Sequence, residues 1–230
     1  MQLQRIRCGN QDAFDNKEYN IGIGISLGNK WFSIENIIEA TKWSLEHTKE
    51  YVVIYMADSI HAINLEVRKK ISAEKAKEQA YSLGASLMTQ IMEAVSKQFS
   101  SEDQKRIHFA HWDAIANSAY QKKVQYLYNL YETNTAFRDA IESIVRNYIA
   151  KEERKFKDEE IHKLGKYILE ELPEHMNIVQ AGEFSYDAFA YPADSETVQF
   201  VERIQKGEIF PEIKKDIIDT EPKAFLVVSQ

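Results

Sequence analysis

Near the start of the chain, residues 20–33 show an alternating apolar pattern, then turn residues, and then apolar positions at helical spacing. Three isoleucines alternate with two glycines over residues 21–25, and alternation of β-branched residues predicts a strand. Glycines weaken a strand, so they indicate a backbone that another group approaches closely. The apolar run stops at Ser26, Gly28 and Asn29 supply turn residues, and helical spacing begins near Ser33. The segment therefore predicts a strand, a sharp turn carrying a serine, and a helix.

The rest of the chain alternates short apolar runs with longer segments of helical spacing. Tyr51–Met56 is a continuous apolar run, which is typical of a strand covered on both faces. Strands followed by helices predict a parallel sheet, so we expect a single α/β domain over residues 1–230. Further extended segments are expected at 3–7, 106–110, 184–191 and 224–228. Helices are expected at 33–47, 59–70, 72–99, 119–132, from 134, at 158–172 with Pro173 as the stop, and at 196–206.

Composition narrows the class of protein further. The formal charge is −7 and the pI about 5.5, so any polyanion partner needs a local basic patch. Cys8 is the single cysteine, which excludes an intrachain disulfide and fits a reducing compartment. Residues 1–19 lack the apolar core of a signal peptide, and no window reaches the ~18 apolar residues of a membrane span. We expect a cytoplasmic protein without a membrane anchor.

The first candidate for chemistry is the serine at the predicted turn. Gly24-Ile25-Ser26-Leu27-Gly28 fits the pattern of a nucleophile elbow. The same five residues equally fit a glycine-rich turn whose serine only caps the following helix. An α/β-hydrolase is disfavoured, because its nucleophile follows several strands and only 25 residues precede Ser26.

A second candidate lies on the 158–172 helix. Tyr167 and Glu171 are four residues apart and share a face. Three glutamates crowd the end of this helix, where the macrodipole disfavours carboxylates. A bound ammonium group relieves that repulsion, but a solvated acidic helix end explains the same residues. Further along, Tyr191 precedes Pro192 and is therefore held extended.

Several common sites are absent from the sequence. The six histidines show no spacing typical of metal ligands, so we expect no metal. There is no Walker A motif, and the glycines near Ser26 do not have the spacing of a dinucleotide-binding loop. No cofactor is expected.

Taken together, three segments resemble the tRNA-dependent cyclodipeptide synthase family. They are Gly24-Ile-Ser-Leu-Gly-Asn-Lys-Trp-Phe-Ser33, Tyr167-x-x-x-Glu171 leading into Leu172-Pro173, and Tyr191. The order and separations agree over nearly the whole chain. The resemblance implies a Rossmann-like parallel sheet flanked by helices, similar to the catalytic domain of class I tyrosyl- and tryptophanyl-tRNA synthetases. It also implies an enzyme that joins two amino acids, delivered by two aminoacyl-tRNAs, into a cyclic dipeptide.

The resemblance also assigns roles to residues. Ser26 is expected to be the nucleophile that carries the first amino acid as an acyl-enzyme. Tyr167 and Glu171 are expected to bind its α-ammonium group, with Glu171 as a base in the second transfer. Tyr191 is expected to relay protons during cyclisation. Tyr120 matches a tyrosine of the substrate pocket and Asp194 a carboxylate near the second substrate.

The resemblance also implies which residues line the pocket for the side chain of the first amino acid. Asn29 belongs to one subgroup of the family and Tyr191-Pro192 to the other, and we favour the Tyr-Pro subgroup. Glu174 stands where apolar-selective members carry an apolar residue. A buried unpaired carboxylate is costly, so we expect a polar first residue, histidine or arginine ahead of leucine or phenylalanine. The expected lining is Gly22, Gly24, Ile54, Met56, Glu174 and Phe189.

The tRNA surface is the least defined part of the resemblance. Family members carry a basic helix for the acceptor stem, but the 72–99 helix has few lysines. We expect the contact at Arg68, Lys69, Lys70, Lys75 and Lys77, with residues 151–157 as a second basic segment. The oligomeric state stays open. The alternative functions are a serine esterase or acyltransferase, and a non-catalytic aminoacyl-tRNA-binding module.

Overall fold

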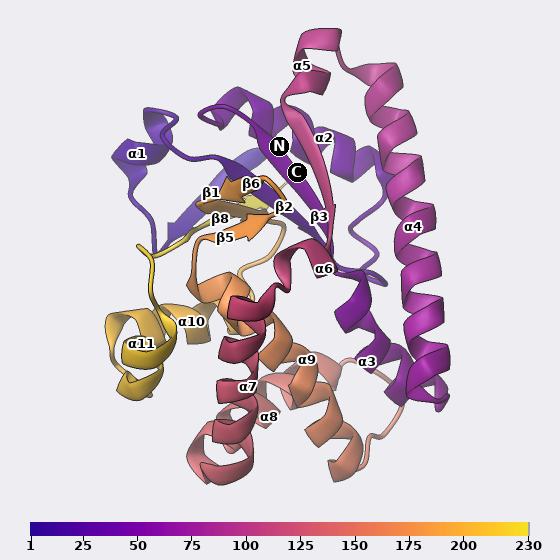
Figure 1. Ribbon diagram of the computed structural model, residues 1–230, viewed down its shortest axis with the longest axis vertical. Coiled ribbons are helices and arrows are strands. Elements are labelled where there is room, and N and C mark those ends of the chain that lie inside the picture. The colour runs from indigo at the N-terminus through magenta and orange to yellow at the C-terminus, as the bar shows by residue number, and fades with distance from the viewer. Residues whose placement is uncertain (230) are drawn as a thin grey trace.

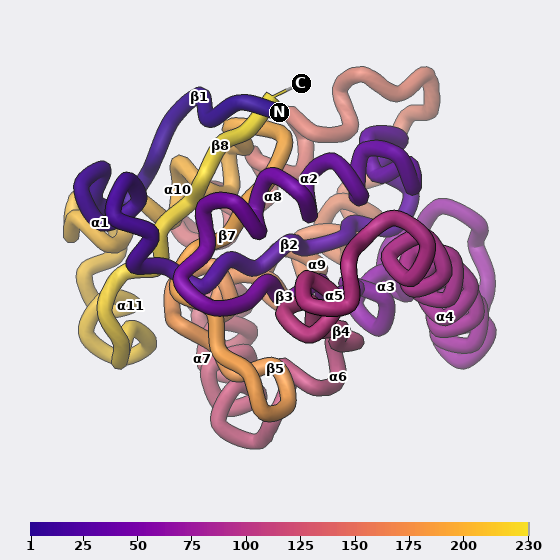
Figure 2. The backbone as a smooth tube through the Cα atoms, turned by 90° about the horizontal axis from the view of Figure 1, so that it is seen from above, coloured from indigo at the N-terminus to yellow at the C-terminus, as the bar shows by residue number. Residues whose placement is uncertain are grey.

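The computed structural model describes residues 1–229, and within them a six-stranded sheet forms the centre of the fold. Its strand order is β1-β8-β7-β2-β3-β4, and all neighbours are parallel except β1 and β8. The order can be followed from above in Figure 2. The strands are β1 (Gln2–Arg7), β2 (Ile21–Ile25), β3 (Val52–Met56), β4 (Ile107–His111), β7 (Ala188–Tyr191) and β8 (Ala224–Ser229). A separate hairpin consists of β5 (Val179–Ala181) and β6 (Phe184–Tyr186).

Helices cover both faces of the sheet and gather beyond one of its edges. In Figure 1, α7, α8 and α9 lie together beyond the edge where α3 and α6 begin. Parallel strands end at that edge, which is where α/β proteins place ligands. The helices are α1 (Gln11–Asp15), α2 (Ile34–His47), α3 (Asp58–Lys69), α4 (Ala73–Gln98), α5 (Ser101–Lys105), α6 (Trp112–Ile115), α7 (Ser118–Thr133), α8 (Thr135–Ile149), α9 (Asp158–Met176), α10 (Glu196–Lys206) and α11 (Pro211–Ile217).

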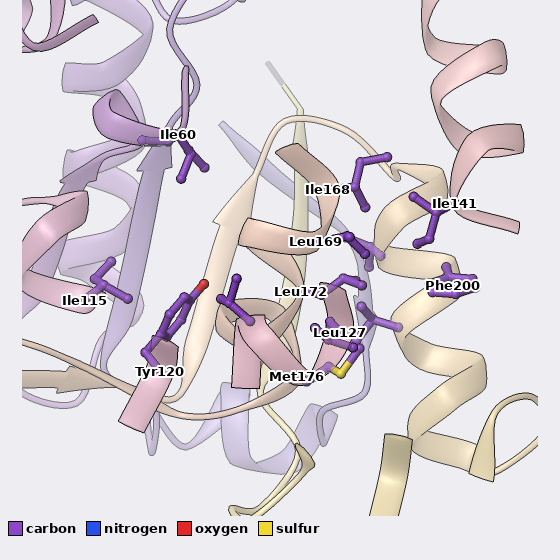
Figure 3. Close-up of a cluster of buried hydrophobic side chains, with 14 of the residues drawn as sticks. Ile60, Ile115, Tyr120, Leu127, Ile141, Ile168, Leu169, Leu172, Met176 and Phe200 are labelled. Carbon is purple, nitrogen blue, oxygen red and sulfur yellow. The ribbon is translucent and has the colours of Figure 1, made fainter. Parts of the chain in front are cut away.

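The sheet separates two hydrophobic cores, because side chains alternate between its faces. The three isoleucines of β2 pack on one face with α2 and the second half of α4. The opposite face carries Tyr55 and Phe189 and packs against helices α6 to α11. Figure 3 shows part of this second core, where Leu169, Leu172 and Met176 of α9 lie among residues from neighbouring helices. Burial of these apolar surfaces, at about 25 cal/mol per Å², holds the helices on the sheet.

The expected fold class is confirmed. The strand, turn and helix predicted over residues 20–33 are β2, a turn, and α2, with Ser33 capping α2 through a hydrogen bond from the Asn36 N–H. The expected extended segment 184–191 divides into β6 and β7 at Asp187, whose carboxylate accepts the Asn20 N–H. Sequence patterns did not reveal the short elements α1, α5, α6, β5 and α11.

The predicted end of the 158–172 helix is wrong. Helix α9 continues through Pro173 to Met176, although proline lacks the N–H that a helix uses. Two features favour the extra turn. Leu172 and Met176 are fully buried in the core, and the Tyr120 hydroxyl donates a hydrogen bond of 2.5 Å to the carbonyl of Glu170. Glu174 and His175 are therefore helical residues that continue the face of Tyr167 and Glu171.

Candidate active site

A cavity of about 170 Å³ lies at the carboxyl edge of the sheet. The loop after β2 forms its rim with Ser26, and the end of β7 adds Tyr191. One side of α9 forms a wall, and the other walls come from α3, α6, α8 and the start of α10. The residues that line the cavity are Gly24, Ser26, Leu27, Asn29, Tyr55, Ala57, Asn64, Trp112, Ile144, Val145, Tyr148, Leu164, Tyr167, Ile168, Glu171, His175, Phe189, Tyr191, Ser195, Thr197 and Val198.

Ser26 is surrounded by hydroxyl groups. The Tyr191 hydroxyl donates to Ser26 Oγ at 3.4 Å, and the Asn29 side-chain amide donates to Tyr191 Oη at 3.4 Å. The Trp31 N–H donates to Asn29 Oδ1 at 3.0 Å, which fixes the orientation of the amide. Gly28 has a φ of +84°, a conformation that glycine adopts without strain. The turn therefore presents Ser26 to the cavity next to Tyr191.

Tyr167 and Glu171 lie on the wall facing Ser26. The Ser26 hydroxyl and the Glu171 carboxyl both act on the pKa of the Tyr167 hydroxyl as neighbouring hydrogen-bonding groups. Burial raises the pKa of the Glu171 carboxyl, while the hydrogen bond from Tyr167 acts in the opposite direction. Burial also raises the pKa of the Tyr167 and Tyr191 hydroxyls. A carboxyl with a raised pKa beside a serine is suited to binding an amine and accepting its proton.

The surroundings of Ser26 differ from those of a serine hydrolase. Within residues 1–229, no histidine forms a hydrogen bond with Ser26 Oγ, whose partners are tyrosines. A serine that attacks an unactivated ester or amide depends on an adjacent base such as imidazole. The esterase alternative therefore lacks its characteristic base, and the site suits an acyl donor that is already activated.

The space above the two strand glycines is occupied by protein rather than left for substrate. A Cβ at Gly22 would overlap the Tyr186 ring, and a Cβ at Gly24 would lie 2.6 Å from Tyr55 Oη and 2.7 Å from the Phe189 ring. Gly22 does not line the cavity, whereas Gly24, Tyr55 and Phe189 form its floor. The expectation that Gly22 contributes to the pocket is therefore corrected.

Ile54 and Met56 also lie outside the cavity. Their side chains pack in the core on the other face of the sheet, together with Ile23 and Ile25. Successive strand residues point to opposite faces, and Gly24 is paired with Tyr55 in the register between β2 and β3. Tyr55 therefore replaces Ile54 and Met56 as the contribution of β3 to the cavity.

Glu174 is buried as expected but is not unpaired, so the reason for expecting a polar first amino acid is wrong. Its side chain is fully buried and accepts from the Lys223 ammonium at 2.6 Å, Tyr55 Oη at 2.9 Å and Tyr186 Oη at 2.8 Å. His175 Nδ1 lies 2.5 Å from its second oxygen. Burial alone would raise the pKa of the Glu174 carboxyl, but Lys223 and His175 hold the pKa well below its usual range. A cationic substrate is not required to neutralise this carboxylate.

Two other expected substrate residues are engaged elsewhere. Tyr120 is buried behind the cavity wall, where its hydroxyl is bound to the Glu170 carbonyl. Trp112, which packs edge-to-face on Tyr120, lines the cavity instead. The Asp194 carboxylate is paired with Arg7 at 2.6 Å and Arg5 at 3.3 Å on the surface. Neither Tyr120 nor Asp194 lines the cavity.

The residues expected to bind tRNA lie on the same surface as the second basic segment, residues 151–157. Arg68 pairs with Glu152, and Lys69 Nζ donates to Gln79 at 2.9 Å. Arg154 donates to the carbonyls of Val67 and Arg68, each at 3.2 Å, so the loop after α8 is attached to the end of α3. Lys70, Lys75 and Lys77 are exposed. The two basic segments that the sequence separates therefore form one neighbourhood.

The structure adds lining residues that sequence patterns missed. His175 follows Glu171 by four residues, so the α9 spacing would have revealed it had the helix been extended past Pro173. Tyr55 follows from strand alternation once the register with β2 is known. Trp112 and Tyr148 carry no local signal, because they reach the cavity through the packing of α6 and α8. The Trp112 indole N–H is buried and has no partner among residues 1–229.

No group of three or more histidine, cysteine, aspartate or glutamate side chains in residues 1–229 is arranged to hold a metal ion. No helix in the same range has the length and apolar character required to cross a membrane.

Solved structures of other proteins resemble the fold of this chain. A cyclodipeptide synthase from Bacillus thermoamylovorans superposes with a TM-score of 0.73 at 20% identity, covering 100% of this chain and 97% of that chain. A synthase from Candidatus Glomeribacter gigasporarum bound to Phe-tRNAPhe gives 0.55 at 17% identity, covering 84% of each chain. Tyrosyl-tRNA synthetase from Archaeoglobus fulgidus gives 0.55 at 14% identity, covering 95% of this chain and 57% of that one. No curated protein sequence matches the chain.

The fold is of the class I tRNA synthetase-like type. The family model described as Cyclodipeptide synthase matches residues 11–210. The chain therefore belongs to the cyclodipeptide synthase family.

The Glu174 cluster generates a prediction about stability. Lys223→Met should lower the free energy of unfolding by about 3–5 kcal/mol, because it leaves a buried carboxylate without its cation. Chemical denaturation followed by circular dichroism measures the loss. Lys215→Met, at an exposed lysine, is the matched control and should change stability by less than about 0.5 kcal/mol. A loss of that small size for Lys223→Met would contradict the role of the ion pair.

Proposed function

We propose that this synthase forms a cyclic dipeptide from two aminoacyl-tRNAs by ping-pong acyl transfer on Ser26. The observation that carries the proposal is the set of groups around Ser26, two tyrosine hydroxyls and the Glu171 carboxyl, without an imidazole. An aminoacyl ester of tRNA is activated already, so the reaction needs positioning and proton transfer rather than a strong base. The Phe-tRNA-bound relative supports aminoacyl-tRNA as the substrate.

In the first transfer, Ser26 Oγ attacks the ester carbonyl of the first aminoacyl-tRNA. The new bond is the ester to Ser26, the broken bond is the ester to the tRNA ribose, and the serine proton passes to the ribose oxygen. The α-ammonium group of the bound amino acid lies at Tyr167 and Glu171. The ionised Glu171 stabilises this cation inside a cavity of low dielectric constant.

In the second transfer, the amine of the acyl-enzyme attacks the ester of the second aminoacyl-tRNA. That amine must first lose a proton, and Glu171 accepts it because burial has raised the pKa of its carboxyl towards that of a useful base. The products are a dipeptidyl-enzyme and a second free tRNA.

Cyclisation releases the product. The free amine of the dipeptide attacks the ester carbonyl at Ser26, so that a second peptide bond forms and Ser26 Oγ leaves. Tyr191 donates a hydrogen bond to this oxygen and is placed to return its proton. Asn29 holds Tyr191 in position through its side-chain amide.

The tRNA contacts are proposed at the end of α3 and the first turns of α4. Lys69, Lys70, Lys75 and Lys77 are exposed there, while Arg68 is already paired with Glu152. Lysines of this kind bind the phosphate backbone without reading the sequence. The attached loop with Arg154 extends the same basic neighbourhood.

Ser26→Ala should lower the rate of product formation by about 10³-fold or more, because it removes the nucleophile. Wild-type protein incubated with labelled aminoacyl-tRNA and quenched in acid should retain label on the peptide that contains Ser26. Ser33→Ala is the matched control, since it removes a hydroxyl from the same segment and costs about 1 kcal/mol of helix capping. Label on another residue, or full activity of Ser26→Ala, would refute the acyl-enzyme.

The pH dependence of the second transfer tests Glu171. Its raised pKa means that the rate should fall as pH drops through a value above the ordinary pKa of 4.5, since only the ionised carboxyl accepts a proton. Tyr167→Phe removes a hydrogen bond that lowers this pKa, so the acid limb should move to higher pH. Tyr128→Phe, which removes a hydrogen bond to Glu170 instead, should leave it unchanged. The measurement is dipeptide formation from preformed acyl-enzyme, and coincident profiles for all three proteins would contradict the assignment.

A quadruple variant replaces Lys69, Lys70, Lys75 and Lys77 with glutamate. It should raise the KM for aminoacyl-tRNA about tenfold or more, and the plot of log affinity against log salt concentration should become less steep. The control reverses four exposed lysines on other surfaces, Lys97, Lys105, Lys214 and Lys215, and makes the same change in net charge. Equal effects of the two sets would show that net charge, rather than this surface, governs the affinity.

A further inference from the structure

The floor of the cavity contains a histidine to which the reaction above gives no role. His175 lies on α9 one turn beyond Glu171 and lines the cavity with its side chain 10% exposed. Its ring packs 5.5 Å from both Phe189 and Phe225, measured between centroids. This packing holds the imidazole in the floor, two turns of α9 below Tyr167.

Glu174 determines which nitrogen of this imidazole carries the proton. His175 Nδ1 lies 2.5 Å from the Glu174 carboxylate, which the Lys223 ammonium keeps ionised. A carboxylate can only accept, so Nδ1 donates its proton. Nε2 is therefore the ring nitrogen that remains for contacts outside the Glu174 pair.

Nε2 belongs to a residue that lines the cavity. Within residues 1–229, the hydrogen bond of the His175 ring is made by Nδ1, and Nε2 has no hydrogen-bond partner. An unpaired ring nitrogen beside Tyr55, Trp112 and Phe189 favours an occupant whose side chain carries a polar group, since an apolar side chain would cover this nitrogen without replacing its hydrogen bonds to water.

The distances from Ser26 and Glu171 to the floor determine which part of the substrate reaches it. Gly24 lies two strand residues, about 7 Å, before Ser26, and His175 lies about 6 Å along α9 from Glu171. An amino acid esterified to Ser26 with its ammonium group at Glu171 therefore extends its side chain towards His175. Only a side chain with its polar group at the far end makes the contact.

We propose that His175, fixed by Glu174, selects a first amino acid whose side chain carries a hydrogen-bonding group such as a hydroxyl at its far end, as tyrosine does and phenylalanine does not. This inference rests on the proposed function, because it takes Ser26 as the site of the acyl group. His175 is a specificity-determining residue that contacts the substrate side chain. Glu174 and Lys223 act through it.

Acyl-enzyme formation with one tRNA charged with either tyrosine or phenylalanine tests the proposal. The shared tRNA removes any contribution of the nucleic acid to the comparison. Wild type should form the tyrosyl-enzyme about tenfold or more faster than the phenylalanyl-enzyme, judged by kcat/KM. In His175→Phe the ratio should fall to about one, because the new ring keeps its packing and loses the Nε2 contact.

Tyr186→Phe is the matched control. It also removes one hydrogen bond to Glu174, but Tyr186 does not line the cavity, so the wild-type ratio should persist. Glu174 keeps three of its four donors in either variant, and circular dichroism checks that both fold. If neither substrate acylates the wild-type protein, the proposed function itself fails.

If the wild-type protein is acylated with a ratio near one, the role of His175 is refuted while the acyl-enzyme stands, whether or not the variant folds. Equal loss of discrimination in His175→Phe and Tyr186→Phe also refutes it, because the effect would then belong to the buried cluster rather than to Nε2.

Discussion

The Glu174 carboxylate, which has no access to solvent, connects α9 to three distant parts of the chain. Its partners come from β3, from β6 and from the residue before β8, together with His175, the next residue of α9. A buried carboxylate that loses its cation destabilises a protein by several kcal/mol, so these elements are constrained to meet. The same contact sets the position of Tyr55 above Gly24 and of the His175 ring in the floor. The shape of the cavity beneath Ser26 therefore depends on one ionic cluster.

The rim of the cavity is held by contacts other than those of the Glu174 cluster. Ser26, Asn29 and Tyr191 are held by a tight turn and by the end of β7, through hydrogen bonds between neighbouring side chains and backbone. Tyr167 and Glu171 approach from α9, which joins the rim to the floor. The groups that act at Ser26 and the groups that contact the substrate side chain therefore lie along one helix, but different contacts hold them in place.

Sequence patterns predicted those parts of the fold and the site that depend on residues close together in the chain. Alternation over residues 21–25, the turn at Gly28 and the four-residue spacing of Tyr167 and Glu171 all follow from strand and helix geometry, and the parallel sheet follows from strands that alternate with helices. The choice of Ile54 and Met56 failed because the register between β2 and β3 determines which face a residue occupies, and that register is a tertiary property. Helix α9 extended past Pro173 because core burial outweighed a missing hydrogen bond. The partner of Glu174 lies 49 residues further along the chain, beyond the reach of any local pattern.

The buried cluster also bears on how such an enzyme changes over evolutionary time. Replacing Tyr55, Tyr186 or Lys223 one at a time removes a donor from a carboxylate that cannot turn to water, so each single step passes through a less stable protein. Replacing Glu174 first leaves the Lys223 ammonium buried without its counterion. Lineages that alter the floor are therefore expected to change several of these positions together, while the groups around Ser26 stay the same. Closely related sequences should then differ in this cluster as a block rather than residue by residue.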